Sequence, residues 1–487
     1  MSLLDISSIA VPGAYISEGT FGLIPQGIAS HFDTYMLGHS TKLGAPKVPT
    51  FIQSLADFDN VFAPSLSRAS VDLFFQQRPG NGLWFIPVTP RDTYSVSIAT
   101  VTGGATYALT IDGFQVAVVA VAGETTQVLL GRLADRVNLL VPHLASLRSG
   151  VLSVKPGSIT VTASANVTLG SKNNAPAYPT VRDCQDALAT LDNQLPQGFL
   201  IAPEFFQSLD LLADHTALAT VMEAHAQDHR FLWVAIADCM ETTATLTTGG
   251  GAVNAALAER QAIGSPRGHL AYYFPYLLNL EGDLVPPSAV VAGVALRRYR
   301  VQGFRQPPAG ASVPVYGTKG PSFPVSDQVQ QQLNPKGVNC IRVLANKGTV
   351  VYGARTVSDS PYYTFVATRV IMNVLSRTLA DALDELVFES VDGLGIVFAR
   401  IKGTAAAVCE RLRVAGALYG ATPDDAYRVV CDASNNPGLD LDQGRVAVDV
   451  YVKPSPTLEV LVARVYRTSL AQTLNDEVSF TNREDQE

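Results

Sequence analysis

The run FLWVAIAD, residues 231–238, decides how the chain is expected to fold. It is short and apolar apart from its last residue, which is typical of a strand that is buried on both faces of a sheet. Similar runs occur at 198–203 and 270–274, and stretches with helical spacing separate them at 208–229 and 251–263. Strands that alternate with helices in this way predict a mostly parallel sheet with helices on both faces.

The same pattern occurs nearer the N-terminus. Strand-like runs at 35–38 and 83–88 flank two stretches with helical spacing. A strand, two helices and a strand indicate a further part of an α/β layer. We therefore expect residues 31–91 and 176–330 to form one α/β domain that an insertion interrupts.

The insertion, residues 92–175, has a different character. Apolar and polar residues alternate at 94–98 and 107–111, and Asp112-Gly113 is a strong hairpin signal between two strand-like runs. One helix is expected at 125–147. The pattern predicts a β-rich inserted domain that lies outside the α/β layer.

The last third of the chain, residues 331–466, predicts a separate α+β domain. A hairpin is expected across 341–355, and long helices at 363–385 and 394–415. Further strands are expected at 427–431, 445–452 and 458–466. The hairpin and the alternating strands favour a largely antiparallel sheet.

Residues 1–30 and 467–487 flank these domains. The first segment is punctuated by proline and glycine, with short apolar runs and too little apolar mass for a core, and the second is polar. An extended arm fits this pattern, and on composition alone a frayed terminus fits it at least as well.

Bulk composition excludes several classes of protein. The net charge is -8, 47% of the residues are hydrophobic and 16% are charged, so the chain lacks both the signature of disorder and the basic footprint of a nucleic-acid binder. The five cysteines are odd in number and form no C-x-x-C, which argues against disulfides or zinc and favours a reducing cytoplasm. No signal peptide and no apolar run near ~20 residues is present, so direct membrane insertion is not expected.

Several segments invite a catalytic interpretation. His225 and His229 lie one helical turn apart, but no third metal ligand is identifiable, and we interpret them as solvated helix residues. Residues 38–42 begin like a nucleophile elbow, but Lys42 stands where a second glycine is required. Gly249-Gly250-Gly251 fits a flexible loop better than an anion site. We interpret Asp381, Asp384, Glu385 and Glu389, on a helix and at its end, as a solvated acidic face. We predict no catalytic, cofactor or metal site, and no enzyme.

Three segments resemble the sheath proteins of contractile phage tails and related injection systems. The first is VPGAYISE at 11–18. The second, 38–88, keeps the family's order of glycine turn, proline, S-x-x-D-F helix, double phenylalanine and asparagine–glycine. In the third, YGART at 352–356 is similar to the family's W-G-A-R-T, with Tyr352 in place of tryptophan. Further similar stretches follow in family order at 386–389 (F-V-F-E), 416–420 (G-A-L-x-G), 436–437, 442–444 and 454–459 (P-x-x-P-x-E).

This resemblance implies a structural subunit that stacks as hexameric rings in a helical sheath around an inner tube. Arms of neighbouring subunits would complete the antiparallel C-terminal sheet by strand addition, and heterologous contacts of this kind build helical filaments. The residues expected to take part are Ala14, Tyr15 and Ile16 in the arm and Val446, Val448 and Val450 in the accepting sheet.

The resemblance also implies contraction that drives the tube through a target cell envelope, as in genome ejection. The C-terminal domain would face the tube and the insertion would face outward, and we expect tube contacts from Arg400, Lys402, Arg411 and Arg413. The other expected partners are baseplate and tail terminator proteins, and no nucleic acid. The expected location is a virion tail or a contractile injection particle, assembled in the cytoplasm of the bacterial host.

Two other interpretations remain open from the sequence. The parallel-sheet region also fits an α/β enzyme or a ligand-binding protein. A structural assembly protein that does not contract fits the remaining features.

Overall fold

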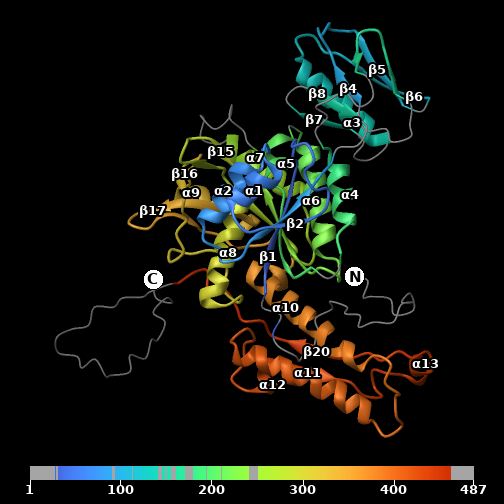
Figure 1. The fold of residues 1–487 in the computed structure, drawn as a ribbon, viewed down its shortest axis with the longest axis vertical. Coiled ribbons are helices and arrows are strands. Elements are labelled where there is room, and N and C mark those ends of the chain that lie inside the picture. The colour runs from blue at the N-terminus through green and yellow to red at the C-terminus, as the bar shows by residue number, and fades with distance from the viewer. Residues whose placement is uncertain are drawn as a thin grey trace, which may run out of the picture.

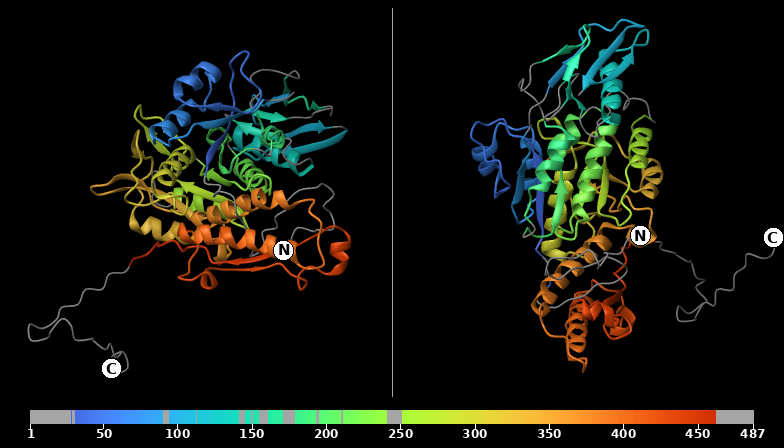
Figure 2. Two further views of the ribbon diagram at one scale, coloured as in Figure 1. Left: turned by 60° about the horizontal axis from the view of Figure 1, so that its bottom comes forward. Right: turned by 90° about the vertical axis from the view of Figure 1, so that its right-hand side faces the viewer.

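The computed structural model describes residue 28 and residues 31–89, 94–111, 113–140, 145–148, 151–154, 161–170, 179–192, 195–209, 211–240 and 251–461. Three parts follow one another along its longest axis (Figure 1). An α/β core lies in the middle, the insertion lies at one end, and the last part of the chain lies at the other, as the side view in Figure 2 also shows.

The central sheet has eight strands in the order β18-β17-β13-β12-β11-β1-β3-β2. Its inner strands run parallel to one another, and the edge strands β2 and β18 pair antiparallel with their neighbours. The strands span Asp33–Gly38 (β1), Thr50–Ile52 (β2), Leu83–Pro87 (β3), Gly198–Ile201 (β11), Val234–Asp238 (β12), Leu270–Phe274 (β13), Val338–Leu344 (β17) and Gly348–Val351 (β18). The prediction of a mostly parallel sheet is confirmed.

Alternate residues of the central strands face two different hydrophobic clusters. In β12, Val234 and Ile236 join one cluster, whereas Ala235 and Ala237 join the other. Side chains of a strand point to opposite faces in turn, so a continuous apolar run is what a sheet covered on both faces requires. Helices cover the first face with α1 (Leu55–Phe62), α2 (Arg68–Gln76) and α8 (Ser288–Gln302), and the second with α4 (Val181–Ala189), α5 (Pro203–Ser208), α6 (Leu212–Ala226) and α7 (Gly251–Ala262).

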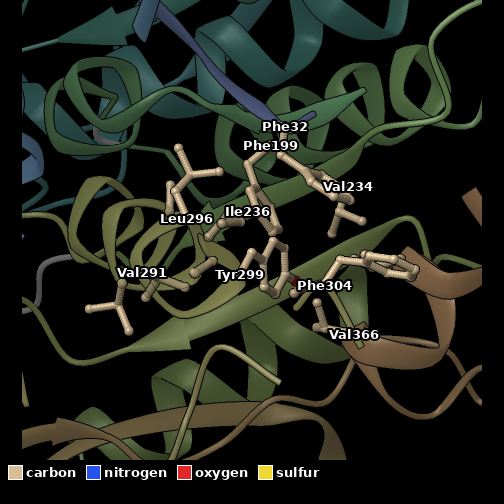
Figure 3. Close-up of a cluster of buried hydrophobic side chains, with 14 of the residues drawn as sticks. Phe32, Phe199, Val234, Ile236, Val291, Leu296, Tyr299, Phe304 and Val366 are labelled. Atoms are coloured by element: carbon tan, nitrogen blue, oxygen red, sulfur yellow. The ribbon is translucent and has the colours of Figure 1, made fainter. Parts of the chain in front are cut away.

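Figure 3 shows the first cluster. Tyr299 of α8 lies beside Phe199 of β11, with ring centroids 6.0 Å apart, and Val366 reaches the same cluster from α10 (Val366–Leu383). Helix α10 then packs against α11 (Ile396–Val414) in the last part of the chain. One continuous helix therefore joins the central core to the C-terminal part, and both share a single hydrophobic cluster.

The described residues of the insertion form two small sheets and one helix. One sheet has the order β10-β4-β8-β7 and the other β6-β5-β9. The expected hairpin is present, with Ile111 paired to Phe114 across a turn in which Gly113 has φ 85°. The bounds are Tyr94–Ser97 (β4), Thr106–Ile111 (β5), Phe114–Val119 (β6), Thr126–Leu140 (α3), Ala145–Arg148 (β7), Val151–Val154 (β8), Val161–Ala163 (β9) and Thr168–Leu169 (β10). The helix expected to reach residue 147 ends at Leu140, and β7 follows it.

The C-terminal part differs from the expectation in three respects. The hairpin β17–β18, expected here, belongs to the central sheet because β17 pairs in parallel with β13. The strand expected over 445–452 is limited to β20 (Asp449–Val452), and no strand forms in the described part of 458–466, residues 458–461. The two long helices are confirmed as α10 and α11. The remaining elements are β19 (Tyr427–Val430), α12 (Pro423–Ala426) and α13 (Gly438–Asp442).

Between these parts the chain forms β14 (Leu277–Asn279), β15 (Leu284–Val285), β16 (Thr318–Pro321) and α9 (Asp327–Leu333). Strands β15, β14 and β16 make a small antiparallel sheet in a stretch that includes the irregular region expected at 303–324. Among the helices of the described residues, none is both long and apolar enough to span a bilayer.

Candidate assembly interface

The C-terminal sheet consists of β19 and β20, and no third strand pairs with them among the described residues. The strands are antiparallel, and Val429 lies opposite Val450. Both valines are buried in the cluster that contains Val408 and Leu412 of α11. On the other face the guanidinium of Arg428 lies 5.9 Å from the centre of the Tyr451 ring. Because each strand has one neighbour, both are edge strands, the type of strand to which a further chain can add.

The connection between the two strands is fixed by asparagine side chains. The amide nitrogen of Asn435 donates to the carbonyl of Val430 at 3.1 Å and to a carboxylate oxygen of Asp449 at 3.1 Å. The backbone N–H of Ala447 donates to Asn436 Oδ1 at 2.6 Å. The backbone of Ala447 thus has side-chain partners in place of a strand ladder, which explains why β20 is shorter than its alternating sequence predicts.

Of the three residues predicted for the accepting sheet, Val446, Val448 and Val450, only Val450 lies in a strand. Val450 lies in β20 with its side chain fully buried, so the main chain is what it offers to an added strand. Val446 and Val448 precede the strand and pack beside a small cluster of Val397, Ile401 and Cys431. Ala14, Tyr15 and Ile16 lie outside the described residues.

After β20 the chain remains paired for a few residues. Tyr419 N donates to the carbonyl of Lys453 at 2.8 Å, and Ser455 N donates to the carbonyl of Ala417 at 2.9 Å. This pairing places the G-A-L-x-G stretch, residues 416–420, beside the P-x-x-P-x-E stretch, residues 454–459. Two segments that are similar to the family in sequence are thus adjacent in space.

The basic residues predicted to contact a tube lie on two flanks of α11. At about 100° per residue, Arg400 and Arg411 share one flank, and Lys402 and Arg413 share the opposite one. Arg400 forms an ion pair with Glu389, and Arg413 forms one with Glu410 at 2.6 Å. Lys402 and Arg411 are exposed. The four side chains therefore do not form a single basic face.

Between the two flanks α11 exposes small and apolar side chains, which we call the α11 stripe. It consists of Ile396, Ala399, Gly403, Ala407 and Val414. Ile396 is 56% exposed and Val414 is 74% exposed. The preceding loop adds Phe388 and Leu394, each 86% exposed, and Phe388 has the unusual φ of 73°. Exposed apolar surface and a non-glycine residue at positive φ both point to an interaction surface, and reading the sequence at helical spacing would have identified the stripe.

The polar clusters of the α/β core are buried and internally paired. His215 contacts Glu259 Oε1 through Nδ1 at 2.9 Å and the carbonyl of Leu209 through Nε2 at 3.2 Å. Tyr272 donates to Glu259 Oε2 at 2.6 Å. With both ring nitrogens and both carboxylate oxygens engaged, the cluster acts as internal bracing between α6, α7 and β13.

The segments considered for catalysis have structural partners. The interpretation of His225 as a solvated helix residue is wrong, because it stacks on Phe231 with ring centroids 4.2 Å apart, and burial lowers the pKa of His225 to about 4. His229 is exposed and lies beyond the end of α6. The hydroxyl of Ser40 donates to the carbonyl of Phe62 at 2.5 Å. Gly251 opens α7, and Gly249 and Gly250 lie outside the described residues. No group of three or more histidine, cysteine, aspartate or glutamate side chains in the described chain could hold a metal.

Comparisons with known proteins agree with this geometry. No family model matches the chain. A tail sheath protein of Vibrio phage KVP40 is 27% identical over 134 residues, and the match spans 27% of this chain and 19% of that protein. The helical sheath of the anti-feeding prophage in its contracted state is 19% identical with a TM-score of 0.58, and the alignment covers 94% of this chain and 100% of that one. The sheath of an extracellular contractile injection system (PVC) in its contracted state is 18% identical with a TM-score of 0.58, covering 94% and 98%. The chain therefore has the fold of a contractile sheath protein, and the resemblance to that family seen in its sequence is confirmed.

Proposed function

We propose that this protein is the structural subunit of a contractile sheath, and that it polymerises as stacked hexameric rings around an inner tube. Contraction of the array drives the tube through the envelope of a target cell. The observation that carries the proposal is a fold shared over 94% of the chain with a contracted sheath. The particle is a virion tail or a contractile injection particle assembled in the bacterial cytoplasm, with baseplate and tail terminator proteins at its ends.

Strand addition at β19–β20 links the subunits. The N-terminal arm, with Ala14, Tyr15 and Ile16, adds a strand to the sheet of a second copy, and the C-terminal arm, residues 467–487, adds another. The support for this step is the edge position of both strands. Main-chain hydrogen bonds supply attachment without large side-chain pockets, because the inward face of the sheet is already filled by Val429 and Val450.

Contraction needs two arrangements of rigid subunits joined by links that persist. The central part and the C-terminal part share one core through α10, so each subunit moves as a unit. The arms are the hinges of this motion. The extended array is a kinetically trapped state that the tube and the baseplate hold until release.

The α11 stripe faces the inner tube, and Lys402 and Arg411 flank it. Small side chains allow close approach of another surface, and the basic flanks favour an acidic partner. Ala407→Glu places a charge in the middle of the stripe at an exposed position. We expect it to weaken co-sedimentation with the inner tube protein about 10-fold or more, while the midpoint of thermal unfolding stays within about 2 °C.

The matched control for this variant is Ala224→Glu, an exposed alanine on α6 of the central part. It should leave tube binding unchanged. Charge reversal of both Lys402 and Arg411 should reduce the salt dependence of tube binding. Equal tube binding by wild type and Ala407→Glu would show that the tube lies against another surface.

Electron microscopy of the purified protein tests the proposed function. Striated tubes or wide polysheaths that form as the concentration rises are the expected result. A monodisperse monomer at every concentration would contradict the proposal and would favour an enzyme or a ligand-binding protein.

A further inference from the structure

The segment that follows β20 returns to the central part of the protein and is held there by one glutamate. In Figure 1 the segment, red at the end of the colour scale, leaves β20 and runs back towards the α/β core. Leu458, Val460 and Leu461 are 75%, 72% and 81% exposed, so apolar burial contributes little to its attachment. Glu459 is the exception, because its side chain is only 25% exposed.

Glu459 is bound by two side chains of the central part. Arg355 Nε donates to its two carboxylate oxygens at 2.9 and 3.2 Å, and Arg355 Nη2 donates to Oε2 as well. Asn334 Nδ2 donates to Oε1 at 2.8 Å. Partial burial by itself raises the pKa of Glu459, but the hydrogen bonds from Arg355 and Asn334 outweigh it and hold that pKa below its usual range.

Arg355 is itself rigidly mounted. Its backbone N–H donates to Asn339 Oδ1 at 2.6 Å, and Asn339 Nδ2 donates to the carbonyl of Arg355 at 2.6 Å. Asn339 lies in β17, fully buried, and its Nδ2 also reaches the carbonyl of Tyr272 in β13. The guanidinium lies 5.7 Å from the centre of the Phe365 ring, which limits the directions in which it can point. Two strands of the central sheet thus fix the backbone of Arg355, from which the guanidinium reaches Glu459.

We propose that Arg355, Asn334 and Glu459 form a latch that sets where the C-terminal arm leaves the subunit, and hence how that arm reaches a second copy. The proposal rests on the sheath function and adds positioning residues to it. The latch joins two family-like stretches, YGART at 352–356 and P-x-x-P-x-E at 454–459, whose residues meet although they are 104 positions apart. Because an arginine fork binds a carboxylate through two parallel hydrogen bonds, it fixes orientation as well as distance, which a lysine would not do.

A spin label at Val460→Cys reports on the latch in the full-length monomer. All five native cysteines are buried, so the label reacts at the introduced, exposed position. The expected result is a restrained label in the otherwise wild-type protein. Glu459→Gln and Arg355→Gln should each raise the mobile fraction about 10-fold, because each removes charge-assisted hydrogen bonds of the latch. The charge swap Arg355→Glu with Glu459→Arg should restore the restraint.

Asp327→Asn is the matched control, because it breaks the neighbouring Arg342–Asp327 ion pair at 2.6 Å, which does not touch the segment. It should leave the label restrained. Equal mobility in wild type and both single variants would overturn the latch. A released label with sheaths of normal length and yield would overturn its role in positioning the arm. A wild-type chain that never polymerises would contradict the sheath function instead, and the label mobility of the monomer would still decide the latch.

Discussion

Replacing Arg369 by alanine should lower the free energy of unfolding by about 3–5 kcal/mol. Arg369 lies in α10 and is fully buried. Its Nε donates to Asn373 Oδ1 at 2.9 Å, and its Nη1 donates to the carbonyl of Arg267 at 3.1 Å. Asn373 in turn donates to the carbonyl of Trp233 at 3.2 Å, next to β12. The substitution would therefore remove partners from buried acceptors and leave a cavity at the point where α10 is anchored to the sheet.

Chemical denaturation of the monomer measures this loss. The matched control is Arg411→Ala, because Arg411 is exposed on α11, and its effect should stay within about 0.5 kcal/mol. Arg369→Lys should fall between wild type and alanine, since lysine keeps the charge but not the planar fork. A loss below about 1 kcal/mol for Arg369→Ala would show that α10 is held by apolar packing alone.

Deleting residues 1–25 should abolish polymerisation and leave a folded monomer. Folding is expected to survive because the hydrophobic clusters of the described chain are built from Ile28 onward. If the arm contributes about four main-chain hydrogen bonds at about 1 kcal/mol each, its loss weakens association about 10³-fold. Sedimentation velocity over a range of concentrations, with circular dichroism on the same samples, measures both outcomes.

A pair of substitutions at one position tests whether the arm acts as a strand. Ile16→Pro removes a main-chain N–H and should also prevent polymerisation, whereas Ile16→Val keeps a β-branched side chain and should not. An unfolded deletion product would mean that the arm is part of the core. Normal polymerisation of Ile16→Pro would mean that the arm does not attach by strand pairing through this residue.

The central sheet could be predicted from the sequence because both of its faces are buried. Every residue of β12 before Asp238 is apolar and buried, and β11 and β13 show the same continuous pattern. The sequence predicts a helix up to residue 147, whereas α3 ends at Leu140. Pro142 was the available signal for this end, because a helix rarely continues through the residue before a proline. The β17–β18 hairpin could be predicted from local sequence. Its parallel pairing with β13 depends on residues far apart in the chain, so the prediction that the hairpin belongs to the C-terminal domain was wrong.

The candidate interface was predicted less well than the fold. The alternation of 445–452 predicts a strand, but Asn435 and Asn436 bind residues beside it and limit β20 to its second half. The basic residues of α11 were chosen by charge, whereas helical spacing places them on two flanks. The pairing of Arg355 with Glu459 depends on tertiary structure, and their presence in two family-like stretches was the available signal.

A density map of the assembled protein is the most direct test of strand exchange between subunits, because it shows what lies beside β19 and β20. We predict a helical array around a tube, in which each C-terminal sheet contains additional strands from other copies and one of these strands includes Tyr15 and Ile16. An assembly in which the sheet still contains two strands from a single copy would contradict it.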